Sequence, residues 1–154
     1  LQRLINEAKP AFYSKYPENR LGFVSNKDLT KASLFDYLIG AADRRLMNIL
    51  LSNDGSRVWL IDHDDFMFID AKKTEMPWLE PTREMLNEAK VRNLNLTIGA
   101  ELVNALKKLI DKLADLISDS REIGIEVPTP ELARVISQIK RRAEKLLQNR
   151  VIPT

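Results

Sequence analysis

The feature that most constrains the fold is a pair of long amphipathic segments in the C-terminal part of the chain. Leucine and isoleucine recur there every three or four residues, from Ile98 to Ile117 and again from about Pro130 to Arg150. This period matches the turn of an α-helix, so each segment predicts a helix with one buried face. A connection that holds Gly124 and Pro128 separates them. The inward positions that we expect are Leu102, Leu106, Leu109, Ile110, Leu113, Leu116 and Ile117 in the first helix, and Leu132, Val135, Ile136, Ile139, Ala143, Leu146 and Leu147 in the second.

Shorter helices are predicted upstream of this pair. A buried helix is expected over residues 30 to 42, and either Asp28 or Thr30 is expected to cap its N-terminus. Its apolar positions are Leu34, Phe35, Leu38, Ile39 and Ala42. Before it, Leu1 to Asn26 carries prolines among aromatic residues, which favours a short helix followed by irregular chain. Thr82 to Arg92 predicts a further short helix.

Two short apolar runs, Asn48 to Leu51 and Val58 to Ile61, lie between these helices. The stretch between them contains Asp54 and Gly55, and an Asp-Gly pair between two β-prone runs is a hairpin signal, because glycine accepts the positive φ of a tight turn. The predicted fold class is therefore α+β: mainly α, with a small β-hairpin.

The length and composition of the chain exclude several classes of protein. A length of 154 residues with 44% hydrophobic content predicts one compact domain over residues 1–154. A net charge of +2 argues against a nucleic-acid partner, and the basic cluster from Lys140 to Arg150 is interpreted as the solvated face of the last helix. The absence of cysteine excludes disulfides and agrees with a cytoplasmic location. No apolar run approaches the roughly 20 residues of a membrane-spanning helix.

Acidic and amide side chains gather around the predicted hairpin. Asp43 follows the helix, Asn48 opens the first strand, and Asp62 follows the second. A hairpin would return Asp62 to the neighbourhood of Asn48, and together they offer the carboxylate and amide oxygens that Mg²⁺ accepts beside phosphate oxygens. Asn48 and Asp62 are therefore predicted metal ligands, and Asp43 is predicted to orient or deprotonate an attacking hydroxyl.

The residues that follow Asp62 leave alternatives open. Asp64 and Asp65 could supply further metal oxygens or form a solvated acidic turn, and Asp64 is kept as a third candidate metal ligand. His63, the sole histidine, is interpreted as a structural side chain that hydrogen-bonds at the hairpin end. Trp78 is expected to pack against the later helices rather than to meet a substrate.

This order of residues resembles the catalytic segment of the phosphoinositide 3-/4-kinase-like group, which includes the HipA-like kinases. The matching positions are Phe35, Asp36, Leu38, Ile39, Asp43, Arg44, Asn48, Leu50, Ile61 and Asp62. The resemblance covers residues 30 to 68 and implies the protein-kinase-like C-terminal lobe of an enzyme that uses Mg²⁺ and transfers the γ-phosphate of ATP to a protein or lipid hydroxyl. It also implies that Asp43 is catalytic, that Arg44 supports its loop by pairing with a carboxylate, and that Asn48 and Asp62 bind the metal and nucleotide.

The nucleotide-covering N-lobe of such kinases has no counterpart here, since only Leu1 to Lys31 precede the matching segment. We therefore expect the N-lobe to come from a removed segment or another chain, and the chain alone to bind ATP weakly. One alternative is a catalytically inactive kinase-like module that docks a protein partner through its last two helices. A metal-dependent hydrolase that uses Asp43, Asp62 and Asp64 is disfavoured, because two-metal sites normally recruit more histidines or acids.

Overall fold

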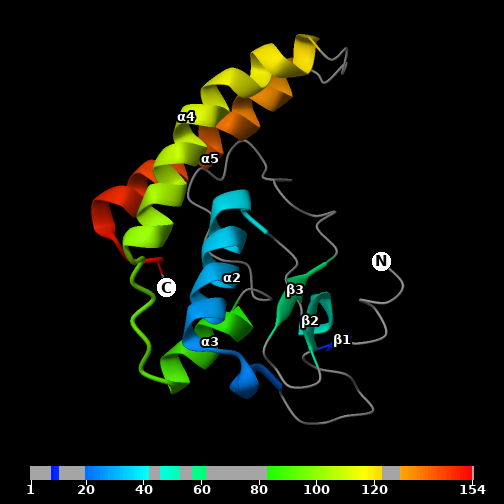
Figure 1. Cartoon of the computed structure of the whole chain (residues 1–154), viewed down its shortest axis with the longest axis vertical. Helices are drawn as coiled ribbons and strands as arrows, with labels where there is room; N and C mark the ends of the chain where they lie inside the picture. Colours follow the sequence, from blue (N-terminus) through cyan, green and yellow to red (C-terminus); the bar gives the residue numbers. More distant parts are fainter. Residues whose placement is uncertain are drawn as a thin grey trace. The chain divides into compact units, whose positions relative to one another are not determined.

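The chain folds into two compact units. This computed structural model describes residues 8–10, 20–41, 46–52, 57–61, 83–122 and 129–153. The first unit comprises Leu1–Leu96 together with Thr154, and the second comprises Thr97–Pro153. A small sheet and the shorter helices belong to the first unit, and two long helices form the second (Figure 1). The fold is therefore α+β and mostly helical, as predicted, whereas a single domain over residues 1–154 stays a prediction.

Helix α2, Asn26–Ile39, begins earlier than predicted because Ser25 caps it. The Ser25 hydroxyl accepts a hydrogen bond from the Asp28 backbone N–H at 3.1 Å and donates one to the Asp28 carboxylate at 2.7 Å. A serine at this position satisfies a backbone donor that the first turn leaves unpaired. The prediction that Asp28 or Thr30 is the cap is therefore wrong, and Thr30 instead donates to the Asn26 carbonyl at 2.8 Å.

Most of the circumference of α2 is buried. Leu29, Leu34 and Leu38 all lie in the core of the first unit, as expected for a helix covered on several sides. Phe35 was expected to point inward and is 42% exposed, so that part of the prediction is wrong. It follows Lys31 by one helical turn on the more open side of the helix, away from Leu29.

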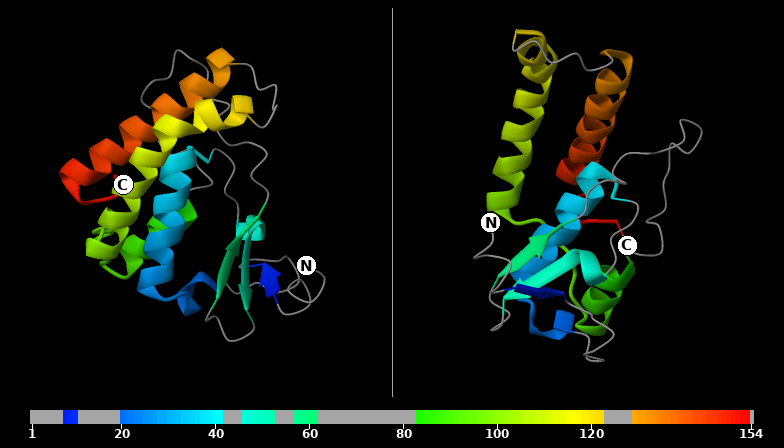
Figure 2. Two further views of the ribbon diagram at one scale, coloured as in Figure 1. Left: turned by 45° about the horizontal axis from the view of Figure 1, so that its top comes forward. Right: turned by 90° about the vertical axis from the view of Figure 1, so that its right-hand side faces the viewer.

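A three-stranded antiparallel sheet packs beside α2. Its strands are β1 (Ala8–Pro10), β2 (Ile49–Ser52) and β3 (Val58–Leu60), in the spatial order β1-β2-β3 (Figure 2). Strands β2 and β3 form the predicted antiparallel pair, with Ile49 opposite Leu60 and Leu51 opposite Val58. Ile49 and Leu51 are buried, which is the alternation expected of a strand with one face on a core.

Strand β1 was not predicted. It pairs with β2 through Ala8 and Ser52, Lys9 and Leu51, and Pro10 and Leu50. Because β1 is an edge strand, the missing N–H of Pro10 costs no bond to a further strand.

Helix α3, Arg83–Val91, packs against α2 and against the short helix η1, Arg20–Phe23. Its bounds agree with the predicted helix from Thr82 to Arg92. Met85 and Ala89 face the core at helical spacing and are almost fully buried. Helix α3 therefore contributes to the core of the first unit beside α2.

The second unit is an antiparallel pair of long helices. Helix α4 spans Ala100–Glu122 and α5 spans Thr129–Asn149, and they run side by side (Figure 2). Their buried residues include Leu106, Leu113, Ile136, Ala143 and Leu146, all of them predicted inward positions. The two ends of the unit are joined by a hydrogen bond from the Ile98 N–H to the Arg150 carbonyl at 2.9 Å.

Candidate functional site

The base of the β2–β3 hairpin is the described part of the predicted site. Asn48 ends the short helix η2, Leu46–Asn48, and directly precedes β2. The Ile61 N–H donates a hydrogen bond to the Asn48 carbonyl at 3.0 Å. Antiparallel pairing thus brings the chain that enters Asp62 against the backbone of Asn48, although the two lie far apart in sequence.

The turn of the hairpin is closed at its ends by two hydrogen bonds. The Ser52 N–H donates to the Arg57 carbonyl at 3.0 Å, and the Arg57 N–H donates to the Ser52 hydroxyl at 2.9 Å. The predicted Asp-Gly turn itself lies outside the described residues. These contacts fix the register of β2 on β3, and register decides which residue lies beside Asn48.

Asn48 is buried, with 6% of its surface exposed. Its side chain offers an amide oxygen and two N–H donors, and a buried amide is normally hydrogen-bonded. An asparagine held at the mouth of a hairpin is a suitable donor of one hard oxygen ligand to Mg²⁺. The predicted role of Asn48 in metal and nucleotide binding therefore fits its position and stays a prediction.

The remaining predicted site residues fall in two segments of the chain. Asp43 and Arg44 lie in residues 42–45, and Asp62 and Asp64 lie in residues 62–82, both outside the described residues. The same holds for His63, Asp65 and Trp78. Within the described ranges no three histidine, cysteine, aspartate or glutamate side chains come together as a metal site.

The end of α2 sets where the chain leaves toward Asp43. Gly40 adopts the left-handed conformation, with φ 65° and ψ 46°, and its N–H donates to the Asp36 carbonyl. The Ala41 N–H donates to the same carbonyl at 3.0 Å. Glycine suits this cap because it has no Cβ to clash, so the helix ends at Ile39 instead of continuing to residue 42 as predicted.

Asp36 is a buried carboxylate at one of the positions that resemble the kinase pattern, and no role was predicted for it. None of its surface is exposed. The burial of Asp36 could have been predicted from the sequence, because Asp36 follows the apolar Leu29 and Ala32 at helical spacing and must share their face. A charged residue on an apolar stripe is uncommon unless it has polar partners.

No family model, curated protein or solved structure that was compared with the chain matches it. Among the described helices, none is both long and apolar enough to cross a membrane. A cytoplasmic location, the absence of a nucleic-acid partner, and the resemblance to kinases all stay predictions.

Proposed function

We propose that the chain is the C-terminal lobe of an ATP-dependent phosphotransferase that acts with Mg²⁺ on a protein or lipid hydroxyl. The observation that carries the proposal is the 3.0 Å hydrogen bond from the Ile61 N–H to the Asn48 carbonyl. Because Asp62 follows Ile61 directly, this contact supports a site in which an amide and a carboxylate share one cation. The order of helix, loop, hairpin and acid along the chain supports it further.

The roles follow from the chemistry of each side chain. Asn48 and Asp62 would hold Mg²⁺, with Asp64 as a further oxygen ligand, and the ion would neutralise the phosphates of ATP. Asp43 would orient the accepting hydroxyl and take its proton. Arg44 would hold the loop by pairing with a carboxylate. An N-lobe supplied by a removed segment or another chain would complete the nucleotide site.

Phosphate transfer in the complete protein tests the proposal. We expect Asp43→Ala and Asp62→Ala each to abolish transfer of label from γ-labelled ATP to a mixed pool of protein and lipid acceptors. Circular dichroism should show unchanged helix content in both variants. Asp111→Ala, an exposed change on α4, is the control and should keep full activity. Full activity in either site variant would refute the assignment.

A catalytically inactive module is the second candidate, because the helix pair over Thr97–Pro153 forms a compact unit that could dock a protein partner. Calorimetric titration separates the two. The enzyme predicts heat when Mg²⁺ and a nucleotide are added together, even if binding is weak, whereas the module predicts no heat with either.

A further inference from the structure

The outward face of α5 carries a row of three cations. Arg134, Arg141 and Lys145 are all exposed. Their spacing of seven and four residues places them within about 40° of one another around the helix, in a row about 16 Å long. Ile136 and Ala143 are buried and lie on the opposite side of α5. The row is therefore the part of α5 that lies farthest from its buried face.

No ion pair compensates for the charge of this row. None of the three cations makes an ion pair with another side chain in the part of the chain that the structure describes. Arg141 and Lys145 are four residues apart, a spacing at which like charges repel each other along a helix. An acidic ligand would relieve this repulsion, so the row favours a negatively charged partner.

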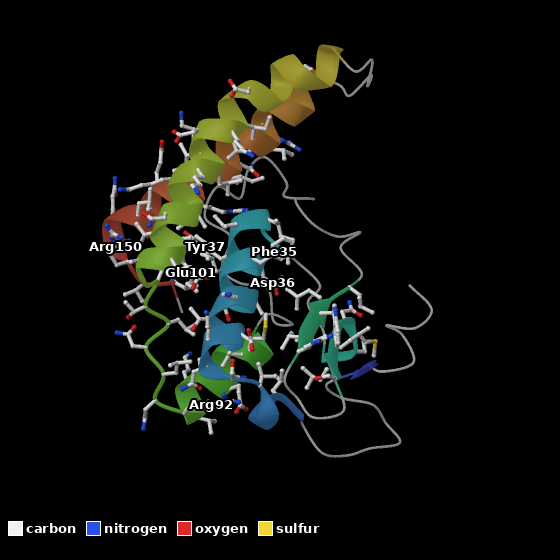
Figure 3. All side chains as sticks on the ribbon, viewed as in Figure 1. Phe35, Asp36, Tyr37, Arg92, Glu101 and Arg150 are labelled. Carbon is white, nitrogen blue, oxygen red and sulfur yellow. The ribbon has the colours of Figure 1, made fainter. Side chains whose placement is uncertain are left out.

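The exposed charges of α4 are balanced, in contrast to those of α5. In its described part they are three lysines and three acids: Lys107, Lys108, Lys112, Glu101, Asp111 and Asp115. Arg150, just after α5, lies at the same end of the helix pair as Glu101 (Figure 3). The positive charge of the pair is therefore concentrated on the outward face of α5.

We propose that this row is a docking surface for an acidic helix of a partner protein. Carboxylates can recur on one face of a helix every three or four residues, so a helix lying along α5 can place one beside each cation. Ser137 and Gln138 lie between the cations in the sequence and offer hydrogen bonds to the same partner. The proposal does not depend on phosphate transfer, because the surface would serve an active lobe and an inactive module alike.

Two other anionic partners fit the row less well. Helices that bind an anionic membrane surface also bury large apolar side chains in it, and the well-exposed large hydrophobic residues of the described chain all lie outside α5. A nucleic acid presents negative charge along its whole backbone, and Glu144, exposed beside the row, would repel it. A partner helix avoids this repulsion by placing a neutral or basic residue opposite Glu144.

Fluorescence anisotropy with the full chain and a labelled acidic peptide tests the proposal. The probe is an alanine-rich helical peptide with glutamates at positions i, i+4, i+7 and i+11. The control peptide has the same composition, with its glutamates spread around the helix. At an ionic strength of about 0.1 M we expect the probe to bind at least about fivefold more tightly than the control peptide, because only the probe presents carboxylates to all three cations. Equal affinities of the two peptides would overturn the proposal.

Two double variants with the same loss of charge separate the row from net charge. Arg141→Gln with Lys145→Gln should weaken binding of the probe at least about fivefold, because two ion pairs to the peptide are lost. Lys108→Gln with Lys112→Gln removes an exposed pair of the same spacing from α4 and should change the affinity less than about twofold. All four changes are on the surface, so circular dichroism should show unchanged helix content in both variants. Equal losses of affinity in the two variants would overturn the proposal.

The other possible occupants are tested under the same conditions. Phosphatidylserine vesicles and a short DNA duplex are titrated with the wild type and with the variant that combines Arg141→Gln and Lys145→Gln. If either binds the wild type more tightly than the peptide does and loses this binding in the variant, the row serves lipid or nucleic acid and the proposal is overturned. If none of the probes binds, the row is a solvated surface only, which also overturns it.

Discussion

A single arginine joins three parts of the first unit at the residue scale. The Arg92 guanidinium donates to the Leu21 and Val24 carbonyls at 2.5 Å each and to the Asn26 side-chain oxygen at 3.0 Å. It also bonds the Glu88 carboxylate at 2.8 Å, one turn back on α3. Those carbonyls lie at the junction of η1 and α2, so Arg92 fastens the end of α3 to the start of α2.

We predict that Arg92→Ala lowers the free energy of unfolding by about 2–3 kcal/mol, because partly buried carbonyls lose a charged donor. Arg92→Lys should recover less than half of this loss, since one ammonium group cannot reach the separate acceptors. Urea titration followed by circular dichroism measures both changes. Lys90→Ala, an exposed change in the same helix, should shift the free energy by less than about 0.5 kcal/mol. A loss that small in Arg92→Ala would contradict the fastening role.

These contacts also show what the sequence could not reveal at this scale. In the sequence, Arg92 was predicted only as the last residue of a helix. Its hydrogen bonds could not be predicted, because the acceptors are backbone carbonyls more than sixty residues away. The cap was misassigned for a related reason. Ser25 and Asp28 are both good cap residues, and which one caps depends on backbone conformation that composition alone does not fix. Of the predicted site residues, Asn48 is the one within the described part of the chain; it is buried, and its metal-binding role stays a prediction.

The ends of helices decide how the elements connect. Gly40 takes a left-handed conformation at the end of α2, and Arg150 does the same after α5, with φ 59°. At the end of α2 the glycine has no Cβ, so this conformation is not strained. After α5 the arginine adopts the same conformation with a Cβ, so its backbone is strained. The left-handed turn at Gly40 therefore favours glycine, and it begins the connection toward Asp43.

We predict that Gly40→Ala lowers the free energy of unfolding by about 1–2 kcal/mol, because an L-residue with a Cβ is strained at a φ of 65°. Gly22→Ala provides a control of opposite sign. A Cβ at Gly22 would meet nothing within 4 Å, and its φ is not positive, so alanine should stabilise the chain by about 0.4–1 kcal/mol. Equal effects of the two changes in thermal unfolding would show that the backbone conformation at Gly40 does not matter.

Helices were predictable as elements, and the full sheet was not. The period of apolar residues located α3, α4 and α5 to within a few residues, because an amphipathic helix is encoded locally. The β2–β3 pair was equally accessible, since its two runs and turn are adjacent in sequence. Strand β1 was missed because it joins β2 from about forty residues upstream and is only three residues long.

The whole molecule raises the question of whether its two units unfold together. The second unit consists essentially of two helices. A helix pair of this size rarely supplies enough buried apolar surface to be stable by itself. We therefore expect the unit Thr97–Pro153 to depend on the rest of the chain, in line with the predicted single domain.

We predict that Leu146→Ala, which removes a fully buried side chain of α5, lowers the free energy of unfolding by about 2–5 kcal/mol and shifts the unfolding of both units equally.

Two spectroscopic probes report separately on the unfolding of the two units. Both tryptophans, Trp59 and Trp78, belong to the first unit, and α4 and α5 contain most of the residues of the described helices, so they dominate the helical dichroism of that part of the chain. The fluorescence and dichroism midpoints should coincide in the wild type and move together in Leu146→Ala, because a cooperative domain has one transition. Lys145→Ala, the exposed neighbouring change, should move neither. If fluorescence kept its wild-type midpoint while dichroism fell, the chain would be two independently folding domains, and the single-domain prediction would be wrong.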